Sequence, residues 1–315
     1  MNDKIIVLKK ELAKAVVGQG EMIEGLLIGL LSDGHILVEG VPGLAKTTTI
    51  NALSKALGLD SKRIQFTPDL LPSDIIGAQI YNPQDHSFSI KKGPLFTHLL
   101  LADEINRAPA KVQSALLEVM QERQVTIAEE TFKLETPFLV MATQNPIEQE
   151  GVYALPEAQL DRFMMKLVVK HNSQEDELDI MRKAATKGFG EVEAVLHIED
   201  LQALQSELNA IHIDEELERY IVQLIGATRD PIAFDLENIS TCIMFGASPR
   251  ASIDLYKASK AYAFLKGKTF VSPADIAAVI HNVLRHRIVL SYEARAKGMK
   301  TDEVISSIVE TLPVP

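Results

Sequence analysis

Two residue types that mark particular protein classes are nearly absent from this chain of 315 residues, which has no tryptophan and one cysteine, Cys242. A lone cysteine excludes a disulfide within the chain, which is typical of a reducing compartment, so we expect a cytoplasmic protein. No apolar run approaches the ~20 residues of a membrane-spanning helix. Lysines interrupt residues 1–18, where a signal peptide would have its apolar segment. We therefore expect neither a membrane span nor a signal peptide.

Clustered positive charge is also missing. The chain has 43 Asp and Glu residues against 32 Lys and Arg, which gives a net charge of −11 at pH 7. Nonspecific binding to nucleic acid depends on clustered Lys and Arg, and single strands are also held by stacking on aromatic side chains. The acidic balance and the lack of tryptophan therefore argue against a nucleic-acid partner.

The most informative segment that is present is residues 40–47, which we interpret as the phosphate-loop pattern G-x-x-x-x-G-K-[ST]. An apolar run at 35–39 precedes it and a predicted helix over 48–59 follows it. Backbone N–H groups of such a loop, and of the helix that it opens, attract phosphate. We expect Lys46 to contact the β- and γ-phosphates and Thr47 to ligate Mg²⁺. The residues predicted to contact the nucleotide here are Gly40, Pro42, Gly43, Leu44, Ala45, Lys46, Thr47 and Thr48.

Polar side chains follow two other apolar runs. Asp103 and Glu104 come directly after residues 99–102, and Asn145 comes shortly after residues 138–143. Parallel sheets bind ligands beyond the carboxyl ends of their strands, so these side chains are expected beside the phosphate loop. We predict that Asp103 holds the Mg²⁺ shell and that Glu104 orients and deprotonates the attacking water. Asn145 is expected to contact the γ-phosphate and that water.

Two arginines are further candidates. Arg162 belongs to a short predicted helix at 155–163, where it is either a surface ion-pair partner or an arginine finger for a neighbouring subunit's nucleotide. Arg250 lies in the first turn of a helix that Ser248 and Pro249 begin, since a capping residue followed by proline is a helix start. We expect Arg250 to reach the γ-phosphate and to report hydrolysis to its own domain.

The pattern of elements predicts two domains. Short apolar runs alternate with helical segments in the first half, which is typical of an α/β fold with a buried parallel sheet. From residue 172 onward only helical periodicity is found. We therefore predict an α/β nucleotide-binding core over 1–171, followed by a smaller all-helical domain over 172–315. The predicted strands are 36–38, 63–66, 99–102, 138–143 and 165–169.

Two other nucleotide-binding classes are disfavoured. Asp74 and Gly77 fit the short D-x-x-G pattern of GTPases, but no Asn-Lys-x-Asp sequence is present to recognise guanine. Gly18 and Gly20 begin a G-x-G pattern, but Ile23 stands where the third glycine of a dinucleotide-binding loop belongs.

Taken together, these residues resemble the AAA+ ATPases, and specifically the MoxR family, over nearly the whole chain. The resemblance is carried by residues 16–19, 40–47, 66–77, 103–108, 142–146, 160–163 and 246–250. It implies an AAA+ P-loop core with a parallel sheet followed by an all-α lid.

The resemblance also assigns roles. Lys46 and Thr47 become the Walker A residues and Asp103 and Glu104 the Walker B pair; Asn145 becomes sensor 1, Arg162 the arginine finger and Arg250 sensor 2; Val17 and Gly18 would lie against the adenine. Two hairpins inserted in the core are implied, and alternating residues support them at 80–83 with 87–90 and at 125–128 with 131–134. A helix is predicted between the hairpins, over 110–122.

This reading predicts a Mg²⁺-dependent ATPase that works as a ring, most simply a hexamer. By resemblance, its task is chaperone-like assembly or activation of a client protein, often one with a von Willebrand factor A-type domain. Two rival functions are a nucleic-acid motor of the same AAA+ branch and a non-hydrolysing scaffold controlled by nucleotide.

Overall fold

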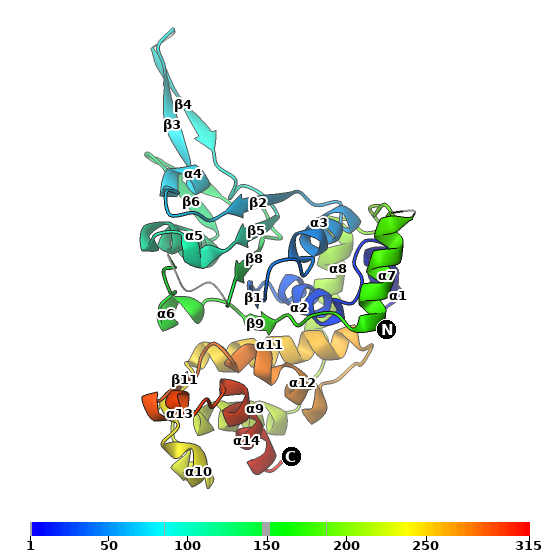
Figure 1. Cartoon of the computed structure of the whole chain (residues 1–315), viewed down its shortest axis with the longest axis vertical. Coiled ribbons are helices and arrows are strands. Elements are labelled where there is room, and N and C mark those ends of the chain that lie inside the picture. The colour runs from blue at the N-terminus through cyan, green and yellow to red at the C-terminus, as the bar shows by residue number, and fades with distance from the viewer. Residues whose placement is uncertain (1, 85, 147–151, 187) are drawn as a thin grey trace.

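The computed structural model describes residues 2–84, 86–146, 152–186 and 188–315. Its centre is a parallel five-stranded sheet in the order β2-β5-β8-β1-β9 (Figure 1). The strands are β1 (Ile36–Glu39), β2 (Ser61–Gln65), β5 (Leu99–Asp103), β8 (Leu139–Gln144) and β9 (Met165–Val168). All five strands were predicted, and the parallel α/β core is confirmed.

Both faces of this sheet are covered, which explains why its strands are apolar without strict alternation. Along β1, Ile36 and Val38 belong to one hydrophobic cluster while Leu37 belongs to the other. The first cluster contains residues of α1 (Asp3–Leu12), α2 (Gly20–Leu31), α3 (Lys46–Ala56) and α8 (Ile198–Asn209). The second contains residues of α4 (Pro72–Ile76) and α5 (Ala110–Glu122). The predicted helix over 110–122 is therefore confirmed.

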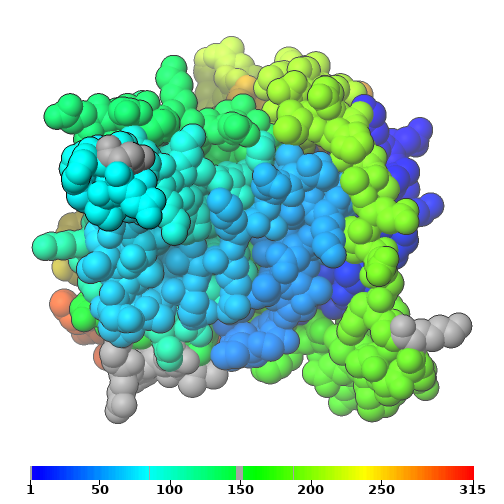
Figure 2. All heavy atoms as spheres, turned by 90° about the horizontal axis from the view of Figure 1, so that it is seen from above, coloured from blue at the N-terminus to red at the C-terminus, as the bar shows by residue number. Residues whose placement is uncertain are grey.

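Both predicted hairpins are present. β3 (Gly77–Asn82) pairs with β4 (Ser87–Lys92), and this hairpin projects from the core at the end opposite the C-terminal helices (Figure 1). In a view along that direction, its cyan surface occupies one corner of the visible face (Figure 2). Asp85, in the predicted turn, lies outside the described residues.

The second hairpin pairs β6 (Gln124–Ile127) with β7 (Glu130–Lys133). Its turn falls at Ala128 and Glu129, one residue earlier than predicted. Ala128 adopts a left-handed conformation with φ 54°. No glycine marks the turn, so the local sequence did not locate it.

The C-terminal part is mainly helical. It contains α9 (Glu215–Ala227), α10 (Glu237–Ser240), α11 (Pro249–Leu265), α12 (Pro273–Leu284), α13 (Tyr292–Ala296) and α14 (Thr301–Thr311). The prediction that it is entirely helical was too strict, because β10 (Ile243–Phe245) pairs with β11 (Val289–Leu290). Strands of three and two residues are too short to show a period of two.

The segment after β9 returns to the core before the chain enters these helices. Following α7 (Gln174–Ala185), the Val195 and Leu196 N–H groups donate to the Ala56 carbonyl at 2.9 and 3.1 Å, and α8 packs beside α2. The boundary at residues 171 and 172 stays a prediction. α11 then runs between the sheet and the remaining C-terminal helices (Figure 1). Among the described residues, no helix is both long and apolar enough to cross a membrane.

Candidate functional site

The phosphate loop connects β1 to α3, at the carboxyl edge of the sheet. Gly40 donates its N–H to the Gln144 carbonyl at 3.2 Å, which ties the loop to the end of β8. Gly43 has φ +88°, a conformation that L side chains rarely adopt, and a Cβ added there would meet no atom within 4 Å. The open side of this glycine faces space that a ligand can occupy.

Ala45 departs from the phosphate-loop pattern, which has glycine at this position. It nevertheless adopts the left-handed conformation, with φ 55° and ψ 21°, and it caps the helix that begins at Lys46. A left-handed non-glycine residue costs roughly 1–2 kcal/mol and tends to occur at functional sites. The loop therefore keeps the backbone turn that a glycine would normally supply. The helix also begins two residues earlier than predicted.

Lys46 lies half-buried in this loop. Its Nζ donates to the Gly40 carbonyl at 2.7 Å. Burial lowers the pKa of the Lys46 ammonium, and the charges of Asp103 and Glu104 oppose that shift. A cation whose hydrogen bond goes to a neutral carbonyl remains available to an anionic ligand.

Asp103 ends β5 and is held by two neighbours. The Thr143 hydroxyl donates to its Oδ1 at 2.6 Å, and Arg63 Nη2 and Nε donate to its Oδ2 at 2.7 and 3.1 Å. Thr143 belongs to β8 and Arg63 to β2, the two strands that flank β5. The carboxylate is therefore held in place from both sides.

Glu104 has a strained backbone and a restrained side chain. Its φ of 56° is left-handed, and its N–H donates to the Thr143 hydroxyl at 2.9 Å. Gln65 Nε2 donates to Glu104 Oε2 at 2.7 Å, and Arg107 Nε lies 3.3 Å from the same oxygen. Both contacts fall on Oε2, so they orient the carboxylate at the edge of the pocket.

These residues surround one pocket of about 400 Å³. Its lining comprises residues 42–48 of the loop together with Arg63, Gln65, Asp103, Glu104 and Asn145. Asn145 is 7% exposed and follows β8 directly. The structure therefore brings together the predicted phosphate-loop, strand-end and amide residues. Arg63 and Gln65 were missed, because nothing in their local sequence shows which strand lies beside theirs.

The donor set suits magnesium. Thr47 and Asp103 both line the pocket, and Mg²⁺ prefers oxygen ligands such as a hydroxyl and a carboxylate. Lys46 and the loop N–H groups supply positive charge for the phosphates beside them.

A second pocket, of about 360 Å³, lies beside the loop and contains Gly18. It is also lined by Val169, whose Cβ would lie 3.2 Å from a Cβ added to Gly40. Gly18 has φ +76°, and a side chain there would meet Asn172 Oδ1 at 2.8 Å. This position fits the adenine contact predicted for Gly18. Val17 is not among the residues that line this pocket.

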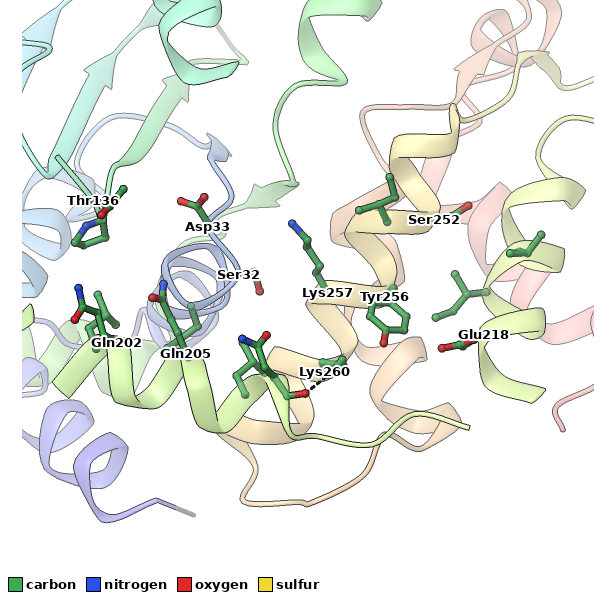
Figure 3. Close-up of a pocket in the computed structure, with 18 residues that line it drawn as sticks. Ser32, Asp33, Thr136, Gln202, Gln205, Glu218, Ser252, Tyr256, Lys257 and Lys260 are labelled. Carbon is green, nitrogen blue, oxygen red and sulfur yellow. Dashed lines mark hydrogen bonds between the residues drawn. The ribbon is translucent and has the colours of Figure 1, made fainter. Parts of the chain in front are cut away.

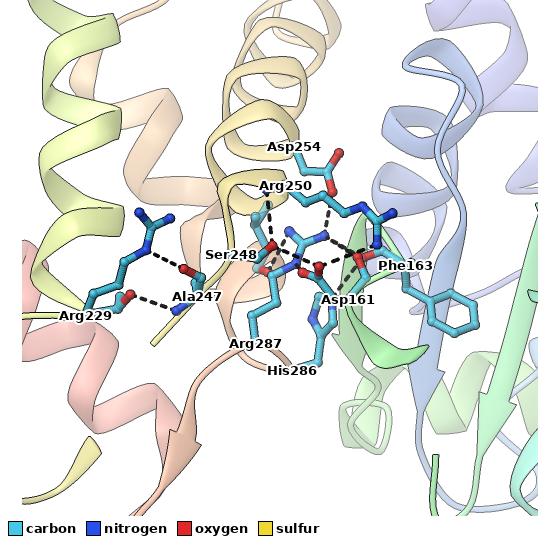
Figure 4. A network of polar contacts seen from close by, with 11 residues as sticks. Asp161, Phe163, Arg229, Ala247, Ser248, Arg250, Asp254, His286 and Arg287 are labelled. Carbon is cyan, nitrogen blue, oxygen red and sulfur yellow. Dashed lines mark hydrogen bonds and ion pairs between the residues drawn. The ribbon is translucent and has the colours of Figure 1, made fainter. Parts of the chain in front are cut away.

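Arg162 and Arg250 lie elsewhere, around a pocket with Asp33 and His35 at the amino end of β1. This pocket shares no lining residue with that of the phosphate loop. Four residues of extended strand separate the two edges of the sheet, a span of roughly 13 Å. Arg250 therefore does not line the phosphate-loop pocket of its own chain in this structure, and its contact with a γ-phosphate stays a prediction. Arg250 Nη1 instead lies 3.7 Å from Asp161 Oδ2 (Figure 4).

A larger pocket, of about 880 Å³, opens between the core and the C-terminal helices (Figure 3). α2, α8, α9 and α11 all contribute to it, with side chains such as Gln205, Tyr256 and Lys260. It contains none of the predicted nucleotide ligands, so size does not identify the phosphate site.

Comparison with known proteins agrees with this geometry. Residues 35–165 match the model of the ATPase family associated with various cellular activities (AAA), and residues 236–308 match the AAA lid domain. A crystallised candidate ATPase from Cytophaga hutchinsonii superimposes with a TM-score of 0.94 and 50% identity, covering 99% of this chain and 95% of that one. The fold and loop thus define an AAA+ protein with a P-loop core and a lid.

Curated relatives narrow the class. The chain is 46% identical to Chaperone MoxR1 of Mycobacterium tuberculosis, over 97% of this chain and 81% of that protein. It is 42% identical to YeaC of Bacillus subtilis (96% and 92% covered) and 32% identical to Protein MoxR of Methylorubrum extorquens (98% and 94%). The chain belongs to the MoxR family of AAA+ ATPases.

Proposed function

We propose that this protein hydrolyses ATP with magnesium and uses the energy to remodel a protein client. One observation carries the proposal: the phosphate loop, two strand-end carboxylates and Asn145 surround a single pocket at the carboxyl edge of the sheet. Family membership supports it, because the MoxR family is a family of ATPases.

The residues divide the chemistry between them. The loop N–H groups and Lys46 bind the phosphates, and Glu104 accepts the proton of the attacking water. Asn145 positions that water and the γ-phosphate. Thr47 and Asp103 would hold the metal. Magnesium, when bound, neutralises phosphate charge as the terminal phosphoryl group leaves.

The site is completed by an adjoining subunit in this proposal. Arg162 and Arg250 lie at the edge of the sheet opposite to the phosphate loop of their own chain. In this proposal, each arginine therefore contacts the nucleotide that is bound by a neighbouring subunit and not the nucleotide of its own chain. A ring, most simply a hexamer, places the amino edge of each core against the carboxyl edge of the next.

The client is proposed by family resemblance. A relative that matches nearly the whole chain is named a chaperone, which supports remodelling or assembly of a client protein. The proposal that this client has a von Willebrand factor A-type domain rests on the family resemblance alone. The projecting β3–β4 hairpin is a candidate contact for that client. The single cysteine fits a cytoplasmic location.

Replacing Glu104 by Gln tests the proposal. We expect ATP turnover to fall about 10²–10⁴-fold, since the base is lost, while binding of a fluorescent ATP analogue persists. Glu122→Gln, at an exposed position at the end of α5, is the matched control and should behave as wild type. Equal turnover in Glu104→Gln and wild type would reject Glu104 as the base. If the wild-type protein binds ATP without hydrolysing it, the result would instead favour the non-hydrolysing scaffold controlled by nucleotide.

A further inference from the structure

The segment that carries Arg162 is tied to the C-terminal helices. Asp161, Arg162 and Phe163 connect α6 (Glu157–Leu160) to β9. Phe163 is fully buried in the core cluster around α5, and its carbonyl accepts hydrogen bonds from Arg287 and His286. The residue after Arg162 is thus bound both to the core and to the lid.

Arg287, just beyond α12, makes most of this connection (Figure 4). Its Nη2 donates to the Phe163 carbonyl at 2.9 Å and to the Asp161 carbonyl at 3.2 Å. Its Nε lies 2.9 Å from Asp161 Oδ1, and Nη2 also donates to the carboxylate of Asp254 on α11. One guanidinium therefore joins the lid to both residues that flank Arg162.

The start of α11 adds a second set of contacts to Asp161. The Ser248 hydroxyl donates to Asp161 Oδ2 at 2.8 Å, and Arg250 lies near the same oxygen. Ser248 also caps α11 by accepting the Arg250 N–H at 3.2 Å. Asp161 therefore connects the two arginines, because Arg162 follows it in the chain and the Arg250 guanidinium lies beside its carboxylate.

Burying the Arg287 side chain is costly unless its charge and its N–H donors find partners. The Arg287 side chain is 1% exposed, while the paired carboxylates of Asp161 and Asp254 are 18% and 21% exposed. Burial raises the pKa of Asp254, and the Arg287 charge opposes that rise. A planar fork of donors suits this task, because it reaches two carboxylates and the carbonyls of Asp161, Phe163 and Val283 together.

Arg162 itself is positioned from a third side, since its Nη1 donates to the Leu117 carbonyl of α5 at 3.0 Å. Its backbone lies between two residues that Arg287 holds. Displacement of a catalytic group by about 1 Å can cost 10²-fold in rate. An arginine finger at position 162 therefore depends on how firmly residues 161–163 are held.

We propose that Arg287 is a positioning residue for the arginine finger: it fixes Asp161–Phe163 to the lid, so that Arg162 and Arg250 meet the neighbouring nucleotide as one rigid unit. The inference rests on the proposed function. Lid and finger of one subunit then move together when the nucleotide at the boundary changes.

The test is Arg287→Lys, which keeps the charge but loses the fork. We expect kcat for ATP to fall about 10–100-fold, with the affinity for ATP unchanged, because the phosphate loop is untouched. Arg219→Lys is the matched control, since Arg219 is an exposed lid arginine that pairs only with Glu215 among the contacts of the described residues. Wild-type kcat in Arg287→Lys would overturn the proposal.

Mixed rings separate a finger defect from general damage. Arg287→Lys subunits should regain turnover when co-assembled with Lys46→Ala subunits, which lend intact fingers, and should gain nothing from Arg162→Ala subunits. Recovery with Arg162→Ala subunits but not with Lys46→Ala subunits would place the defect at the phosphate loop and overturn the inference. If Lys46→Ala and Arg162→Ala fail to complement each other, the shared site itself fails.

Asp254→Asn provides a second route if Arg287→Lys does not fold, which circular dichroism and thermal melting will show. It removes a charge that orients Arg287 and keeps the side-chain size. A smaller fall in kcat with the same complementation pattern supports the proposal. Wild-type kcat in a folded Asp254→Asn protein, together with an unfolded Arg287→Lys, contradicts it.

Discussion

Glu104 illustrates how single residues are held before the reaction. Its backbone is left-handed and its carboxylate accepts from Gln65 at 2.7 Å. Asp103, one residue earlier, is oriented instead by Thr143 and Arg63. Neighbouring carboxylates thus have separate partners, which suits one as a metal ligand and the other as a base.

Removing the hydrogen bond that restrains Glu104, the proposed base, should speed the reaction. In Gln65→Ala we expect the basal rate of ATP hydrolysis to rise several-fold, up to about 10-fold, because the hydrogen bond from Gln65 stabilises the charged carboxylate, which must become neutral when it accepts the proton. Steady-state turnover at saturating ATP measures this. Gln223→Ala, exposed on α9, is the control. A fall in turnover would mean that Gln65 orients Glu104 for catalysis.

At the scale of elements, His35 joins three parts of the core. Its Nδ1 accepts the Val140 N–H of β8 at 3.0 Å, and its Nε2 lies 3.1 Å from the Met120 carbonyl of α5. Burial, with a smaller contribution from the Arg123 charge, lowers the pKa of His35 to about 3. The neutral ring therefore links the start of β1 to α5 and to β8.

This linkage predicts acid sensitivity. The folded pKa lies below the unfolded value near 6.5, so the stabilisation is present above pH 6.5 and is lost as pH falls toward 3. The free energy of unfolding should fall by about 1.4 kcal/mol per pH unit in this window from His35 alone.

Denaturant unfolding at pH 7 and pH 5 measures the effect. His35→Gln should lower stability at pH 7 and show a weaker pH dependence than wild type. The exposed His212→Gln is the control and should retain the full dependence. An unchanged slope in His35→Gln would contradict the burial argument.

Local sequence patterns predicted single helices and strands better than they predicted which of these elements lie side by side. The five core strands were found because each is short and apolar, and α11 and α12 because Ser-Pro starts mark them. The β10–β11 pair was missed because its strands are so short. The positions of Gln65 and Arg250 depend on which elements lie beside them, and a linear sequence does not show this.

At the scale of the whole molecule, charge limits the possible partners. The net charge of −11 repels a polyanion. We expect filter binding with duplex and single-stranded DNA at low salt to show no retention with or without ATP. Retention that weakens steeply with salt would favour the nucleic-acid motor instead.

The central claim is that ATP is bound at the phosphate loop of one subunit and hydrolysed with an arginine from the next. The most direct measurement is the ATP turnover of rings co-assembled from Lys46→Ala and Arg162→Ala subunits. Each variant alone should be nearly inert. Lys46→Ala lacks the ammonium group that binds the phosphates, and Arg162→Ala lacks the finger, which contributes ~10³–10⁵ in rate. The mixture should recover about a quarter of the wild-type rate, because about one boundary in four joins an intact loop to an intact finger. No recovery in verified mixed rings, or full activity of Arg162→Ala alone, would contradict the account.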